Sequence, residues 1–106
     1  MIYYGVIVQP RAERDIEQAY RFRARQNRAA ADRWLDEILV GIESLEEMPS
    51  RCPVAPESAY VDREVRHLIH REHRIIFLVQ ERHVRVLTVR HAARKPLRRI
   101  PQLPRA

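Results

Sequence analysis

Between Glu64 and His91, three apolar runs follow one another with only two short polar breaks, and this spacing constrains the fold more than any other feature of the sequence. Parallel neighbours in a sheet need a crossover connection of about a dozen residues or more, which neither break can supply. The stretch therefore predicts a three-strand antiparallel meander. Its strands are expected at Val65–Ile69, Ile75–Val79 and Val84–Val89.

One strand and two amphipathic helices are predicted upstream of the meander. The composition of Ile2–Val8 is typical of a strand. Apolar residues then recur with helical spacing over Arg11–Gln26, and again over Arg28–Glu47, where the stripe includes Trp34, the only tryptophan. The proline-containing segment 49–62 must then lead the chain from the helices to the meander.

The predicted order is β-α-α-β-β-β, which indicates an α+β fold. A two-helix hairpin should pack on one face of an antiparallel sheet, with Trp34 as its core anchor. The other face is left to solvent or a ligand. Strand alternation sorts the side chains between the faces. It separates Arg74, Ile76 and Leu78 from His73, Ile75, Phe77 and Val79, and it separates Val86, Thr88 and Arg90 from Leu87, Val89 and His91.

The length and the prolines predict one domain over residues 1–91 followed by a basic tail over residues 92–106. Pro96, Pro101 and Pro104 exclude a long terminal helix, so the tail is expected to be extended and to become ordered against a partner. The charge is segregated as well. Residues 1–62 hold 8 Lys/Arg and 11 Asp/Glu, a net −3, whereas residues 63–106 hold 12 and 3, a net +9. This asymmetry favours an anionic partner.

Several classes of function are excluded by what the sequence lacks. No run approaches the roughly 18 apolar residues of a membrane span, and the N-terminus does not resemble a secretory signal. Cys52, the only cysteine, suits a reducing cytoplasm. His70 and His73 lack the further ligands that a zinc site needs, and Gly5 and Gly41 make no phosphate loop, so neither a metal nor a cofactor is expected.

One enzymatic chemistry stays open, the cleavage of RNA through its 2′-hydroxyl group. The reaction needs a base, an acid and cations around the phosphate. His67 or His91 could move the protons, and Arg66, Arg74 and Arg90 could hold the phosphate. However, no tyrosine follows the last strand, so the basic half lacks an aromatic platform on which bases could stack.

The chain resembles the RelE/ParE family of bacterial type II toxins over most of its length. Three groups of residues carry this resemblance. They are Gln9-Pro10-Arg11-Ala12-Glu13 at the entry to the first helix, Ala30-Ala31-Asp32-Arg33-Trp34 in the second helix, and Val65-Arg66-His67-Leu68, His73-Arg74-Ile75-Ile76-Phe77 and Val86-Leu87-Thr88-Val89-Arg90-His91 in the meander.

The resemblance implies a toxin that is neutralised by a cognate antitoxin, and the family has two activities on one fold. The absent tyrosine and the ending Val89-Arg90-His91-Ala92-Ala93-Arg94 look like the ParE branch, which inhibits DNA gyrase and has no assigned catalytic residue. The alternative is a RelE-like, ribosome-dependent mRNA endonuclease that would use His67, Arg74 and His91. The side chains expected to bind the target or the antitoxin are Arg66, Arg74, Arg90, His91 and Arg94.

Overall fold

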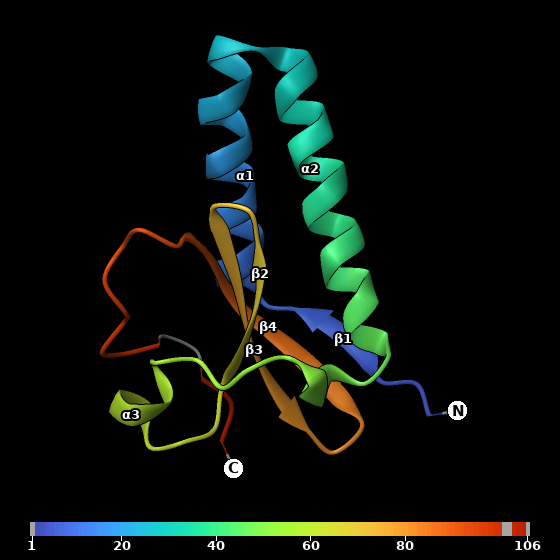
Figure 1. Cartoon of the computed structure of the whole chain (residues 1–106), viewed down its shortest axis with the longest axis vertical. Helices are drawn as coiled ribbons and strands as arrows, with labels where there is room; N and C mark the ends of the chain where they lie inside the picture. Colours follow the sequence, from blue (N-terminus) through green and yellow to red (C-terminus); the bar gives the residue numbers. More distant parts are fainter. Residues whose placement is uncertain (1, 101–102, 106) are drawn as a thin grey trace.

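A four-stranded mixed sheet forms the centre of the molecule (Figure 1), and the computed structural model describes residues 2–100 and 103–105. The strands are β1 (Gly5–Val8), β2 (Arg66–His70), β3 (His73–Gln80) and β4 (His83–His91), in the spatial order β1-β4-β3-β2. The last three form the predicted antiparallel meander, and β1 joins β4 in parallel. The predicted α+β class is confirmed. Within the described residues, no helix is long and apolar enough to cross a membrane.

Two-residue turns connect the strands of the meander. Arg71 and Glu81, the first residue of each turn, have left-handed backbone conformations with φ of 52° and 57°. A left-handed residue lets the chain reverse within two residues and matches the twist of the flanking strands. The turns are therefore tighter than the predicted breaks, and β3 and β4 begin at His73 and His83, inside the polar segments.

The two long helices form a hairpin whose ends follow local chemistry. Helix α1 (Pro10–Gln26) has Pro10 in its first turn. Proline has no N–H group, which costs nothing there because N–H groups of the first turn make no hydrogen bond within the helix. Helix α2 (Arg28–Glu43) begins after Asn27, whose side chain accepts a hydrogen bond of 3.0 Å from the Ala30 amide. The prediction extended this helix to Glu47, but the chain tightens after Glu43 into a 3₁₀ turn, η1 (Ser44–Glu46).

The helix hairpin covers one face of the sheet and buries the main core against it. Trp34 and Phe77 are both buried there, and the odd-numbered residues of β3 share this face, as the predicted alternation grouped them. Arg23 lies over the indole ring of Trp34, at 5.0 Å from its centroid. The fully or nearly fully buried members of this core are Ala12, Ile16, Trp34, Ile38, Ile42, Leu45, Cys52, Ile75, Phe77, Val84, Val86 and Val89.

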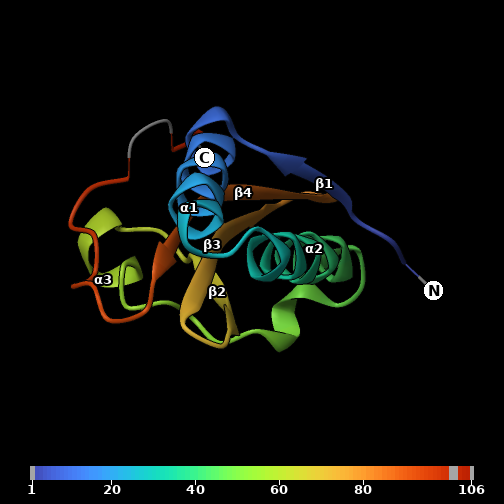
Figure 2. The ribbon, with the colours of Figure 1, turned by 90° about the horizontal axis from the view of Figure 1, so that it is seen from above.

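The opposite face of the sheet is covered as well, which corrects the expectation that it is left to solvent or a ligand. The short helix α3 (Ser58–Val61) lies on this side together with the C-terminal tail, whereas the turn η2 (Pro49–Arg51) lies beside the end of α2 (Figure 2). The tail thus packs on its own domain. A second core results, made of Ala55, Val61, Val65, Ile76, Leu78, Leu87, Leu97, Ile100 and Leu103. Pro101 lies outside the described residues.

A β-bulge in β4 breaks the predicted alternation of faces. Phe77 pairs with Val86. Ile76, which precedes Phe77 in β3, pairs with Thr88 rather than with Leu87, so Leu87 is the extra residue. An extra residue shifts the side chains beyond it to the opposite faces. Val86 and Val89 therefore both belong to the helix-side core. The predicted grouping of Val86 with Thr88 and Arg90 is wrong for this reason.

Candidate functional site

The most enclosed polar group lies on the tail side of the sheet. Arg74, on β3, donates hydrogen bonds of 2.9 and 2.7 Å to the two carboxylate oxygens of Glu57, which directly precedes α3. The Nη1 atom of Arg74 also lies 3.1 Å from Nδ1 of His67 on β2. Glu57 is 0% and Arg74 5% exposed. This buried ion pair joins the segment after α2 to the centre of the sheet.

The pKa shifts of Glu57 and His67 indicate which groups around Arg74 are charged. Burial alone raises the pKa of Glu57, but the hydrogen bonds from Arg74 and from the Leu97 amide lower that pKa overall. Burial, assisted by the charge of Arg74, lowers the pKa of His67. Since a guanidinium group can only donate, Nδ1 of His67 must accept. His67 is therefore a neutral acceptor that orients Arg74.

The C-terminal tail closes over this pair. The Leu97 amide donates to Oε2 of Glu57 at 3.0 Å, and Arg90 donates to the Lys95 carbonyl oxygen at 2.8 Å. Arg90 itself is buried. Two of the five side chains predicted to bind a partner, Arg74 and Arg90, are thus enclosed. Arg90 bonds directly to the tail, and Arg74 holds the Glu57 carboxylate that accepts from it.

The other three predicted binding residues have accessible groups, but they do not form one cluster. Arg66 donates 2.5 Å to the Cys52 carbonyl oxygen and pairs with Glu64 at 2.7 Å, and the His91 side chain is half-exposed. Arg94 is exposed and belongs to a set of cations along the tail that we call the tail ridge. The tail ridge consists of Arg94, Lys95, Arg98, Arg99 and Arg105, all exposed.

The three residues of the RNase alternative are not brought together. His67 pairs across the sheet with Ile76 of the tail-side core, whereas His91 pairs with His73 on the helix side. His67 and Arg74 are thus separated from His91 by the sheet itself. No group of three His, Cys, Asp or Glu side chains in the described residues could hold a metal ion.

A cluster of three aromatic rings lies on the helix side of the sheet. The ring of His73 contacts Trp34 at 5.2 Å and His91 at 5.4 Å between centroids, in both cases edge to face. Burial, with smaller contributions from Arg23 and His91, lowers the pKa of His73 to about 4. His73 is therefore neutral at pH 7.

Stability is expected to fall as the pH is lowered from about 6.5 to about 4. In this window the unfolded chain binds a proton at His73 and the folded chain does not, so acid favours unfolding. The free energy of unfolding should drop by roughly 2–4 kcal/mol from this residue. Urea unfolding at a series of pH values measures it. A His73→Phe variant should flatten the curve, whereas a variant of the exposed His83, His83→Phe, should not; equal curves for both would contradict the assignment.

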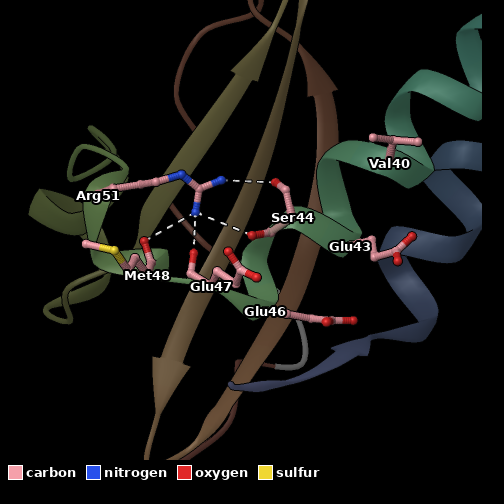
Figure 3. A pocket seen from close by; sticks show the side chains of 7 residues that line it. All are labelled: Val40, Glu43, Ser44, Glu46, Glu47, Met48 and Arg51. Carbon is pink, nitrogen blue, oxygen red and sulfur yellow. Dashed lines mark hydrogen bonds between the residues drawn. The ribbon is translucent and has the colours of Figure 1, made fainter. Parts of the chain in front are cut away.

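An acidic hollow lies at the end of α2, and the sequence reasoning missed it. Val40 and Met48 are exposed there beside Glu43, Glu46 and Glu47, around a volume of about 530 Å³. Figure 3 shows why the hollow is acidic. The guanidinium group of Arg51 is directed at the backbone, where Nη1 donates 2.6 Å to the Glu47 carbonyl oxygen and Nη2 donates 3.0 Å to the Ser44 hydroxyl. The sequence indicated this hollow only through the close spacing of three acids, Glu43, Glu46 and Glu47.

An apolar groove runs between α2 and β2 and shares Val40 and Ser44 with the acidic hollow. Val40 is 65% and Ile69 55% exposed, which is high for large apolar side chains at one site. These two side chains make the groove a candidate contact surface for a partner. The α2–β2 groove, of about 450 Å³, is lined by Asp36, Glu37, Val40, Gly41, Ser44, Leu68, Ile69 and His70.

Comparison with known proteins agrees with this architecture. A structure of the chromosomal ParDE toxin–antitoxin system from P. aeruginosa superposes with a TM-score of 0.68 over 84% of this chain and 96% of the other, at 14% sequence identity, and so shares the fold. A search of curated proteins gives no match. The family described as "ParE toxin of type II toxin-antitoxin system, parDE" matches residues 6–96. The chain belongs to this ParE toxin family, and its partner is accordingly a cognate antitoxin.

Proposed function

We propose that the chain inhibits DNA gyrase in the cytoplasm and that the tail ridge contributes to binding the target. Membership of the ParE toxin family carries the proposal. Two observations support it. His67 and His91 lie on opposite faces of the sheet, so the residues considered for RNA cleavage do not surround one phosphate. The cations of the tail ridge are exposed, whereas Arg74 and Arg90 are occupied inside the fold.

We also propose that the antitoxin neutralises the toxin by binding in the α2–β2 groove. The groove offers exposed Val40 and Ile69 to the apolar side chains of a partner segment. The groove lies between α2 and β2. The backbone of the tail, which carries the tail ridge, lies on the other side of the sheet from α2 (Figure 2). The antitoxin and the target therefore have separate primary contact surfaces on this toxin.

A DNA supercoiling assay with purified gyrase and purified toxin tests the proposed activity. The unaltered chain should inhibit supercoiling, and the double variant Arg94→Glu, Arg98→Glu should need at least about tenfold more protein, because reversed charges slow a cation-guided association. The control is Arg14→Glu, Arg25→Glu, which changes the net charge equally at two exposed sites of α1. Gyrase that remains fully active with an excess of folded toxin would refute the proposal. Discrete cuts in ribosome-bound mRNA would instead support the endonuclease alternative.

A further inference from the structure

The cations of the tail ridge stand on a backbone that the fold holds in place. The Leu97 amide donates to the Glu57 carboxylate at 3.0 Å, and Nε2 of Gln80 donates to the Arg105 carbonyl oxygen at 2.6 Å. Between these two points, Ile100 is 6% exposed and belongs to the tail-side core. The ridge is therefore ordered before it meets a partner, and binding costs less conformational entropy than it would for a disordered tail.

The charges of the tail ridge are not compensated by the protein itself. The sequence contains no Asp or Glu after Glu81. Among the described residues, no cation of the ridge forms an ion pair with a carboxylate. Another exposed arginine of the chain, Arg71, does form one, with Glu37 at 3.2 Å. The cations of the ridge are thus available to neutralise the charges of a partner.

The composition and the spread of the tail ridge fit a phosphate backbone. Four of its five cations are arginine, and a planar guanidinium group binds a phosphate through two hydrogen bonds at once. The ridge extends from Arg94 to Arg105, and the described residues of this segment form no helix or strand. Duplex DNA carries one negative charge per roughly 1.7 Å of its axis, so it presents phosphates to cations spread along such a segment. A group of one or two carboxylates would pair with only part of the ridge.

One aromatic ring contacts the tail ridge, and a guanidinium group already lies over it. The guanidinium carbon of Arg98 is 5.5 Å from the ring centroid of Tyr60, on α3. Proteins that bind single strands stack successive bases on several open aromatic faces. A single tyrosine engaged in this way does not supply them. A duplex keeps its own bases stacked and needs only contacts to its phosphates, so these features favour a duplex over a single strand.

We propose that the tail ridge binds the phosphate backbone of duplex DNA, independently of base sequence. The inference rests on the proposed function, since gyrase acts on duplex DNA and a toxin that inhibits it meets its target there. The ridge then holds the toxin on the DNA beside the enzyme. The α2–β2 groove takes no part in this contact.

Fluorescence anisotropy of a short labelled duplex, titrated with the purified toxin, tests the inference. The logarithm of the binding constant should fall linearly with the logarithm of the salt concentration, with a slope of about −3 to −4.5, because each neutralised phosphate contributes about −0.9. Two duplexes of unrelated sequence should bind equally well. Absence of binding at about 50 mM salt, or binding that salt does not weaken, would overturn the proposal.

Two competitors separate duplex DNA from other anions. A single strand of the same length, and polyglutamate at an equal concentration of charges, should each displace the labelled duplex at least about tenfold less well than unlabelled duplex does. Equal competition by polyglutamate would show a general affinity for anions. Better competition by the single strand would show a preference for unpaired bases. Either result refutes the proposal.

Two double variants locate the binding at the tail ridge. Arg94→Gln, Arg98→Gln should weaken binding at least about tenfold and reduce the salt slope by about 2, since two phosphate contacts are lost. The matched control is Arg25→Gln, Arg28→Gln, which removes two exposed charges at the turn between α1 and α2, away from the tail (Figure 1). It should keep most of the affinity. Circular dichroism checks that both variants fold, and equal salt slopes of the two folded variants would contradict the proposal.

The DNA titrations contain no gyrase, so the two proposals can fail separately. A toxin that inhibits supercoiling but does not bind the labelled duplex refutes only the DNA contact. A toxin that binds the duplex through the ridge but leaves gyrase fully active refutes only the proposed function.

Discussion

An Arg74→Met variant is expected to lose about 3–5 kcal/mol of unfolding free energy, because the substitution leaves the carboxylate of Glu57 buried without its cation. Glu57 is fully buried and receives both of its closest side-chain hydrogen bonds from Arg74. A domain of this size has a total stability of roughly 5–15 kcal/mol. The loss is thus a large fraction of the whole. Urea unfolding at pH 7 measures it.

Removing both charges of the pair should be much less harmful than removing one. The double variant Arg74→Met, Glu57→Leu is expected to recover most of the loss, because apolar side chains of similar volume replace two buried charges. Arg71→Met, at an exposed residue next to β3, is the matched control and should change stability little. A loss below about 1 kcal/mol in Arg74→Met would show that Glu57 becomes protonated or hydrated at little cost.

Phe77→Ala is expected to lower the free energy of unfolding by about 3–5 kcal/mol, since it opens a cavity in the helix-side core. Phe77 lies on the central strand β3, is 0% exposed and belongs to the same core as Trp34 and Ile38. The variant should unfold at a lower urea concentration, with a similar dependence on denaturant.

The matched control is the only other phenylalanine. Phe22 lies on α1 and is 61% exposed, so Phe22→Ala removes the same atoms from an accessible site. This variant is expected to change stability by less than about 1 kcal/mol. Similar losses in the two variants would mean that the core does not carry the stability assigned to it.

The fold could be predicted from the sequence because its signals are local. The short breaks of the meander exclude crossovers, and the stripe that includes Trp34 fixes which side of α2 is buried. The parallel pairing of β1 with β4 joins residues from opposite ends of the chain, and no local pattern encodes it. The bulge at Leu87 is equally invisible, since it depends on how Ile76 and Phe77 are paired.

The site was harder to predict than the fold, for a reason that Arg74 illustrates. Arginine in a basic stretch of sequence suggests a surface cation. Arg74 is instead buried and pairs with the carboxylate of Glu57, seventeen positions earlier in the chain. Glu57 lies in a proline-containing segment, and its partner could not be inferred from spacing. The same holds for Trp34. Its place in the core was expected, but the sequence does not show that its buried N–H group has no hydrogen-bond partner among the described residues.

The place of β1 in the sheet also bears on how the toxin is made. Within the described residues its neighbour in the sheet is β4, which the ribosome adds roughly eighty residues later. At synthesis rates of about 5–20 residues per second, the first strand waits roughly 4–16 seconds for its partner. Throughout this time the nascent chain has no complete sheet. The folded toxin thus forms only after β4 has been synthesised, and a message cut short before β4 yields none.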